Sequence, residues 1–478
     1  MKKNIIILTI ASLLLVSCDK EFLTQEPILT QSSVLTLSDY EGLNAATAGI
    51  YAPFHSVNWY GASFVLNSEL MGGNAKNPTN TDFTSGRYTV PYHWNFTPSS
   101  TSAIWSLAYY VISASNNVIN NLEGKETSTV KVEDLNNLKA ECLFLRSLAY
   151  FDLVRTYAQP YTHMPDGPGV PIVLVSEIGQ PSRNTTKEVY ERIVTDLTDA
   201  ESIIGADYSR AEIMDVTDKA AVVSKEVIQA LLSRVYLYMG NWQKSADYAT
   251  KVINSGKYGM FTADNLLSQW GKNTAEEGGE VIYELYGSQK NSYWGSWDMI
   301  SYLTNPDGYA DVASTADLRD MYEASDVRGK LFKSHPDATD HFWTLKYPGK
   351  VGLTLPMDNN VILIRLSEMY LNRAEAIYNG ATIPGVTADS DLLKITSNRG
   401  ASPVSASSTT IFDERRKEFA FEGHIFFDFA RTKKSITRVD YDGTAVNKDI
   451  AFPSYKWAMP IPKSEIDANA NMVQNENY

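Results

Sequence analysis

Residues 138–155 read LKAECLFLRSLAYFDLVR, and this stretch has the clearest helical pattern in the chain. Its apolar positions recur every three or four residues, which places them on one face of a helix. Those positions are Leu138, Cys142, Leu145, Ala149 and Leu153. Charged side chains lie outside that stripe. The pattern predicts a long helix, continuing to residue 157, that packs against other helices.

Similar periodicity predicts further helices over residues 39–51, 104–122, 188–204, 361–378 and 412–432. Between 138–157 and 188–204, four prolines between residues 160 and 171 predict a loop. Ser224 is a plausible cap for a helix ending before Gly240, and a partner helix follows over 243–253. This helix pair resembles one tetratricopeptide repeat. Because one repeat cannot bury its own apolar face, several pairs are expected to stack.

The remaining segments lack helical periodicity and are rich in Gly, Asn, Asp and aromatic residues. We therefore predict a mostly α-helical fold, a tetratricopeptide-like scaffold of helix pairs with a loop-rich, partly β region laid over it. After residues 1–17, the chain is expected to form one body, 18–478. Its scaffold is assigned to 38–52, 104–256, 361–379 and 410–432. The loop-rich parts are 53–103, 257–356, 380–409 and 433–478.

The N-terminus has the features of an export signal. Two lysines precede the apolar run 5–16, which is too short to span a bilayer. The run ends in Leu15-Val16-Ser17-Cys18, which resembles the lipobox of bacterial lipoproteins. There the signal peptide, here residues 1–17, is removed and the cysteine, here Cys18, is acylated, with palmitate among the usual chains. The alternative is an ordinary secretory signal with a chance cysteine.

The composition excludes several protein classes. The chain of 478 residues has 56 acidic and 42 basic side chains, a formal net charge of −14, which argues against a general nucleic-acid binder. Two cysteines cannot build a disulfide scaffold. If Cys18 carries lipid, Cys142 has no partner, and its place in a helical stripe predicts a small buried core residue.

Several segments together resemble the SusD/RagB family of Bacteroidetes outer-membrane lipoproteins. The matches run in order along nearly the whole chain. They begin at Cys18 and continue through 138–155, 190–200, 234–238, 364–376, 414–428 and 460–475. The resemblance implies a tetratricopeptide-like helical fold and a location at the outer membrane, anchored by lipid and facing the cell exterior. It also implies a SusC-like TonB-dependent barrel as partner and a binding role without catalysis.

The residues themselves favour no enzyme class. The six histidines form no HExxH pair, and GxSxG, P-loop and GxGxxG motifs are absent. His335 and His341 flank acidic residues, but a polar loop is favoured over a metal site. No cofactor is predicted, and calcium binding is left open. The charge cluster 414–418 is interpreted as a structural ion-pair network, with a transporter contact as the alternative.

Aromatic residues concentrate between positions 283 and 302, where rings in a loop cannot all be buried on one face. Sugar rings stack their C–H faces on such rings, and their hydroxyls need polar partners. In the resembled glycan binders this part of the chain, with the early loop, supplies the ligand contacts. The candidate binding residues are therefore Asn74, Arg87, Tyr88, Trp94, Asn95, Tyr286, Tyr293, Trp294 and Trp297. The alternative is that these rings pack loops onto the helices.

The sequence thus predicts a surface lipoprotein that captures oligosaccharide or polysaccharide and delivers it to a SusC-like transporter. Two alternatives remain on the same scaffold. One is a peptide or glycopeptide receptor, whose pocket would rely on backbone-directed polar groups rather than flat rings. The other is a mainly structural lid of the transporter.

Overall fold

The computed structural model describes residues 36–78, 84–211, 218–287, 297–352 and 354–478. Cys18, Tyr293 and Trp294 lie outside these ranges. Helices dominate the fold and strands are short, as predicted. In the described ranges, no helix is long and apolar enough to cross a membrane.

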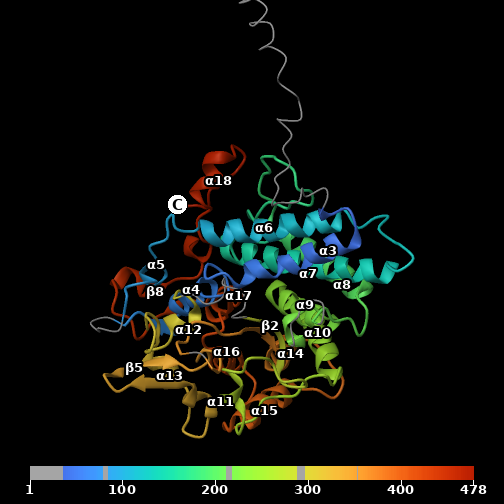
Figure 1. Ribbon diagram of the computed structural model, residues 1–478. Coiled ribbons are helices and arrows are strands. Elements are labelled where there is room, and N and C mark those ends of the chain that lie inside the picture. Colours follow the sequence, from blue (N-terminus) through green and yellow to red (C-terminus); the bar gives the residue numbers. More distant parts are fainter. Residues whose placement is uncertain (1–35, 79–83, 212–217, 288–296, 353) are drawn as a thin grey trace, which may run out of the picture.

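The scaffold is a series of helices in which chain neighbours pack side by side (Figure 1). Contacts run from α6 to α7, α7 to α8, α8 to α9, α9 to α10 and then α10 to α14. The scaffold helices are α3 (Tyr40–Ile50), α6 (Ser102–Ile119), α7 (Val132–Tyr157), α8 (Thr186–Ile203), α9 (Lys225–Met239), α10 (Trp242–Asn254) and α14 (Leu366–Tyr378). Stacked helix pairs are the arrangement that the tetratricopeptide-like pattern predicts.

Helix α7 is the centre of this scaffold, and its predicted stripe is buried. Arg146 reaches α8 and binds both carboxylate oxygens of Asp196, each at 2.8 Å. The Cys142 thiol is also buried, which raises its pKa to about 12 and suits a core residue. The cap at Ser224 is confirmed, because its hydroxyl accepts the Val227 N–H at 3.4 Å.

Shorter elements cover the scaffold. The helices are α4 (Ser63–Gly72), α5 (Thr89–His93), α11 (Leu266–Gln269), α12 (Ile300–Leu303), α13 (Ala316–Arg319), α15 (Ala388–Arg399), α16 (Ser408–Glu418), α17 (Ile425–Arg431) and α18 (Lys463–Ala468). Single 3-10 turns occur at Ala52–His55, Lys219–Ala221, Val327–Leu331, Ala445–Asn447 and Tyr455–Trp457. The strands are β1 (Ala75–Lys76), β2 (Val281–Leu285), β3 (Ala313–Ser314), β4 (Phe332–His335), β5 (Ala338–Thr344), β6 (Val361–Arg365), β7 (Ile436–Thr437) and β8 (Asp449–Ile450).

The strands form four antiparallel pairs, β1 with β3, β2 with β6, β4 with β5, and β7 with β8. In the β2–β6 pair every residue is buried, and Leu285 lies opposite Val361. The predicted helix 361–378 is therefore wrong over its first five residues. Val361-Ile362-Leu363-Ile364 is an apolar, mostly β-branched run, and a buried strand accommodates it better than a helix.

Three other predicted boundaries also need correction. The segment 380–409 is not all loop, because α15 begins there with Thr387 and Ser390 in a capping box. The segment 53–103 contains α4, which is buried on most sides and so shows no amphipathic pattern. The expected helix 412–432 is two helices, since Phe421 and Gly423 adopt positive φ angles of 64° and 82° between them.

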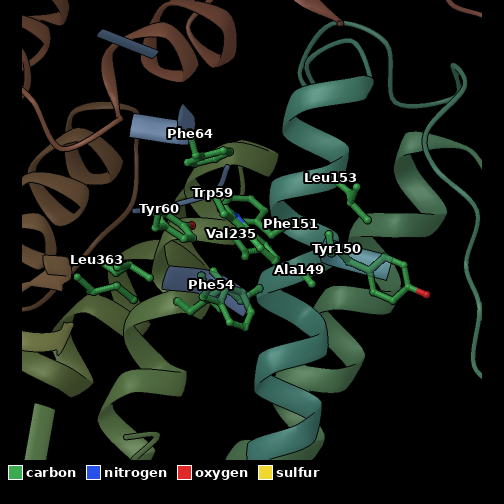
Figure 2. Close-up of a cluster of buried hydrophobic side chains, with 14 of the residues drawn as sticks. Phe54, Trp59, Tyr60, Phe64, Ala149, Tyr150, Phe151, Leu153, Val235 and Leu363 are labelled. Atoms are coloured by element: carbon green, nitrogen blue, oxygen red, sulfur yellow. The ribbon is translucent and has the colours of Figure 1, made fainter. Parts of the chain in front are cut away.

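Aromatic side chains fill the core where the segment after α3 meets α7 (Figure 2). The rings of Phe54 and Trp59 lie 4.4 Å apart. The Trp59 indole N–H donates to Asp152 of α7 at 2.8 Å, so this buried polar group is satisfied. These aromatic residues are therefore structural.

Candidate functional site

Arg87 lies beside the described end of the predicted aromatic segment 283–302. Its guanidinium Nε is 2.9 Å from a carboxylate oxygen of Asp298, and its Cζ lies 3.9 Å from the centre of the Tyr309 ring. The loop that carries Arg87 is fixed by Asp311, a buried carboxylate that accepts the N–H groups of Ser85 at 2.8 Å and of Arg87 at 3.2 Å. The stacked and paired guanidinium is thereby held in one orientation.

Trp297 lies beside this arginine and is half exposed, with 50 % of its surface accessible. Its ring meets Tyr302 edge-on at 5.3 Å, and Tyr302 meets Tyr309 edge-on at 4.9 Å. Tyr302 is buried, so the exposed indole rests on a fixed support. We call Arg87, Tyr88, Trp297, Asp298, Tyr302 and Tyr309 the Trp297 site.

A surface hollow of about 420 Å³ adjoins the Arg87–Asp298 pair. Such a volume lies within the range of small-molecule sites, roughly 300–1,000 Å³. Polar groups line it. The Ser63 hydroxyl and the Tyr88 phenol are 3.1 Å apart, and burial raises the pKa of Tyr88, so the phenol stays protonated. Within the described residues, the side-chain amides of Asn58 and Asn67 make no hydrogen bond. Hydroxyl-rich ligands need such donors and acceptors.

The structure brings together three of the predicted binding residues, Arg87, Tyr88 and Trp297. The other described candidates lie in other surroundings. Trp94 is buried edge-on against Phe426 at 5.6 Å, and Asn95 is exposed at the end of α5. Tyr286 lies under the Lys350 amine, 4.1 Å from its ring centre. Tyr293 and Trp294 fall outside the described residues.

Asn74 is fully buried, which indicates a structural role in place of the predicted ligand contact. Its amide donates to a Glu69 oxygen at 2.8 Å and accepts from Arg416 at 2.7 Å. Glu69 is itself buried, and burial raises its pKa to about 7, although the hydrogen bonds from Asn74 and from the Phe421 and Gly423 backbones oppose that shift.

We expect Asn74→Ala to lower the free energy of unfolding by about 1–3 kcal/mol, because it leaves buried polar groups without partners. Ligand affinity of the folded variant should be unchanged. Denaturant titration measures the first quantity and calorimetry the second. Asn95→Ala, at an exposed position, serves as the control and should alter stability by less than about 0.5 kcal/mol. A selective loss of binding in Asn74→Ala would contradict the structural assignment.

Sequence reasoning missed several contributors to this surface. Asp298 directly follows Trp297, so its position in the sequence could have marked it as a candidate binding residue. Tyr309, Ser63, Asn58 and Asn67 carried no such signal, because only the tertiary fold brings their segments beside Arg87.

The histidines of the chain do not form a metal centre in the part that the structure describes, where no group of three or more His, Cys, Asp or Glu side chains is arranged to hold an ion. His335 and His341 lie on the β4–β5 hairpin instead of the expected loop. His341 Nδ1 is 2.9 Å from the neighbouring Asp340 carboxylate.

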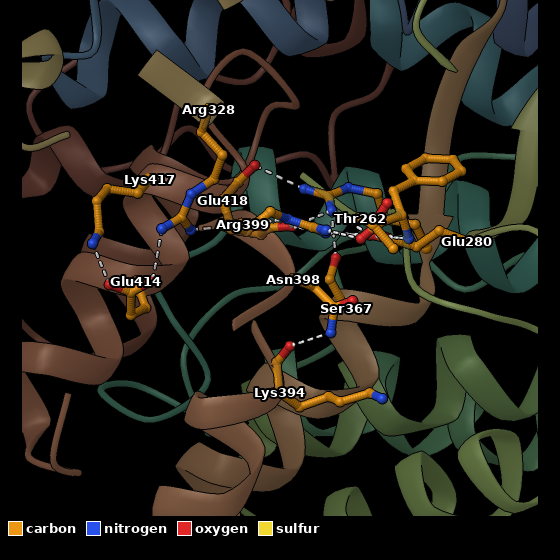
Figure 3. Close-up of polar contacts among 12 residues, drawn as sticks. Thr262, Glu280, Arg328, Ser367, Lys394, Asn398, Arg399, Glu414, Lys417 and Glu418 are labelled. Carbon is orange, nitrogen blue, oxygen red and sulfur yellow. Dashed lines mark hydrogen bonds and ion pairs between the residues drawn. The ribbon is translucent and has the colours of Figure 1, made fainter. Parts of the chain in front are cut away.

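The charge cluster 414–418 belongs to a buried ion-pair network, as the structural interpretation predicted (Figure 3). Glu418 binds three arginines from other elements, Arg328 at 3.0 Å, Arg365 at 2.5 Å and Arg399 at 2.6 Å. Burial alone would raise the pKa of Glu418, but these guanidiniums hold it well below its usual range. The network joins α15 and α16 to β6 and the turn before β4.

Comparison with known families gives the same assignment as the residue matches. A family profile described as starch-binding and associating with the outer membrane matches residues 21–237, and the SusD family profile matches residues 356–478. The chain belongs to the SusD/RagB family. The helix pairs and short sheets described above are therefore a SusD-like fold.

Individual relatives extend the match over the whole length. The SusD-like protein P2 of Formosa agariphila is 24 % identical, with 99 % of each chain covered. The starch-binding protein SusD of Bacteroides thetaiotaomicron is 35 % identical over 124 residues, 25 % of this chain and 22 % of that protein. A solved SusD superfamily structure from the latter organism superposes with a TM-score of 0.81 at 29 % identity, covering 91 % of this chain and 99 % of its own.

Proposed function

We propose that this SusD-like protein captures glycan at the Trp297 site. The half-exposed indole, supported edge-on by Tyr302 and flanked by the Arg87–Asp298 pair, is the observation that carries the proposal. A sugar ring can stack on the indole while its hydroxyls bond to the guanidinium and carboxylate. One relative named for starch binding, which matches 25 % of this chain, and the family profile described as starch-binding support this ligand class.

The wider role proposed is nutrient capture at the outer membrane, with delivery of the glycan to a SusC-like TonB-dependent barrel. Family membership supports both parts. The protein acts here as a binding protein and not as an enzyme, because the Trp297 site offers a platform and a charge-neutral ion pair instead of an activated nucleophile.

Calorimetry of the lipid-free protein against a panel of neutral oligosaccharides tests the ligand class, with peptides of similar size as the second arm. We expect saturable binding of at least one oligosaccharide and none of the peptides. Binding of peptides alone would overturn the glycan assignment in favour of a peptide receptor. No binding of either, with stable co-purification of a barrel, would favour the structural lid.

Lipid attachment at Cys18 gives a separate prediction. The Cys18→Ser variant should lose its acyl anchor and appear in the soluble or secreted fraction, because the body relies on buried acyl chains, each CH₂ contributing about 0.8 kcal/mol. Membrane fractionation and mass of the N-terminal peptide are the measurements. Cys142→Ser is the matched control and should remain membrane-bound. Retention of both variants in the membrane would remove the lipobox assignment.

A further inference from the structure

A second hollowed region lies away from the Trp297 site, where α10 begins and where α14 and α17 end. Two surface hollows of about 320 and 490 Å³ share the lining residues Trp242 and Asn379. They therefore form one groove, which we call the Trp242 groove. Each hollow alone has the volume of a small-molecule site.

The larger of these hollows has three side-chain amides, of Asn241, Gln243 and Asn379, among apolar and aromatic lining residues, and the smaller is lined by cations and rings. Lys433, Lys434 and Arg431 face the smaller hollow, against a single carboxylate, Glu375. Both Glu375 oxygens are already bound by the Arg431 guanidinium, one at 2.5 Å and the other at 2.8 Å. Because Glu375 neutralises Arg431, Lys433 and Lys434 remain as the positive charges of this hollow, in a chain whose net charge is −14.

The Lys434 amine lies over an aromatic ring beside a backbone carbonyl, and it forms no ion pair with a carboxylate among the described residues. The Nζ atom lies 4.1 Å from the centre of the Phe412 ring and 3.5 Å from the Ser408 carbonyl oxygen. Among the described residues, neither Lys433 nor Lys434 has an acidic side chain within 4.0 Å. Burial lowers the pKa of Lys434, while Asp413, Glu375 and Asp428 act against that shift from longer range. A bound anion would therefore gain a charge-assisted hydrogen bond that the protein itself leaves unmade.

Rings stand beside these amines. Trp242 lies between the two hollows, and Tyr378, 46 % exposed, lines the smaller one together with Phe412. We propose that the Trp242 groove is a second binding site, specific for acidic glycans, with a sugar ring against Trp242 and Tyr378 and a uronate carboxylate at Lys433 and Lys434. This site shares no residue with the Trp297 site, so the two proposals stand or fall separately.

Calorimetry with trigalacturonate at low salt, against its methyl ester as a neutral match, tests this site. We expect saturable binding of trigalacturonate and at least tenfold weaker binding of its methyl ester. Added salt should lower the affinity for trigalacturonate. Lys434→Met keeps an apolar side chain over Phe412 but removes the charge, so it should lower the affinity for trigalacturonate at least tenfold. Lys434→Arg keeps the charge and should retain most of that affinity. Lys394→Gln, an exposed lysine on α15, is the matched control and should bind normally.

Four outcomes would overturn the proposal. The first is equal binding of ester and acid, and the second is unchanged affinity in Lys434→Met. The third is displacement of trigalacturonate by an equal concentration of inorganic sulfate, which would reduce the site to a simple anion site. Trp297→Ala should bind trigalacturonate like the native protein. The fourth outcome is a loss of trigalacturonate binding in Trp297→Ala, which would place this ligand at the Trp297 site instead. Thermal melting of each variant confirms that it is folded.

Discussion

Glu418→Gln is expected to lower the free energy of unfolding by about 3–5 kcal/mol, the cost typical of breaking a buried ion pair from one side. Glu418 is the carboxylate shared by Arg328, Arg365 and Arg399, and all four side chains are buried. The amide cannot neutralise three guanidiniums. Glu280, which binds Arg365 at 2.7 Å and Arg399 at 2.9 Å, would remain as a partial counter-charge.

Urea denaturation monitored by fluorescence measures the loss of unfolding free energy in Glu418→Gln. The control for this measurement is Asp467→Asn. Asp467 pairs with Lys463 at 2.7 Å on the surface, where both side chains are more than half exposed, so its loss should cost at most about 1 kcal/mol. The milder Glu414→Gln reports on the same network if Glu418→Gln does not fold. Equal effects of the buried and surface substitutions would contradict the assignment.

The network also sets an expected pH dependence. The folded-state pKa of Glu418 lies well below its unfolded value because of the three arginines. Its contribution to stability is therefore fully present above the unfolded pKa of about 4.3 and is lost as the pH falls below it. In Glu418→Gln this part of the acid destabilisation should be absent, which thermal melting between pH 3 and 7 would show.

Trp297→Ala is expected to reduce oligosaccharide affinity at the Trp297 site at least tenfold, and to abolish binding where the native affinity is weak. The indole provides the exposed stacking face, and truncating an aromatic anchor commonly costs 2 kcal/mol or more. Half of the Trp297 surface is accessible, so the fold should lose little stability. Calorimetry with the oligosaccharide that binds the native protein is the measurement.

Two further variants make this test specific. Trp297→Phe keeps a smaller ring and should retain part of the affinity. Tyr110→Ala removes an aromatic side chain that is 60 % exposed on α6 and belongs neither to the Trp297 site nor to the adjoining hollow, so this variant should bind like the native protein. Unchanged affinity in Trp297→Ala would exclude the indole from the site, whereas equal losses in Trp297→Ala and Tyr110→Ala would indicate a nonspecific effect.

Periodicity predicted the scaffold helices well, because helices that pack on neighbouring helices repeat apolar residues every three or four positions, and α7 keeps this repeat although most of its residues are buried. It failed where that condition does not hold. Helix α4 is enclosed on most sides and shows no stripe, and the buried run 361–364 is apolar on both faces whether it forms helix or strand. For α15, the capping pair Thr387 and Ser390 was the signal that periodicity alone did not provide.

The candidate site was predictable only in part. Arg87 and Trp297 were recognisable as a cation and a ring in loop-like segments, and the structure places both at one surface. Asn74 had the same kind of sequence context, yet it lies buried between Glu69 and Arg416. Burial of a polar residue depends on its distant partners, so a loop residue that binds ligand and one that satisfies a buried charge look alike in sequence.

The sequence by itself determined the helical class and the family, because periodic burial and local motifs depend on neighbouring residues. For residues 414–418 the sequence favoured an ion-pair role over a transporter contact, and the tertiary structure supplies the three arginines that bind Glu418. Only the tertiary structure determined which rings stay exposed. Trp59 and Trp297 are both tryptophans in irregular segments, but Trp59 is buried against Phe54 and Trp297 is half accessible. That difference arises from which chain segments fold over each ring, and those contacts join residues far apart in the sequence.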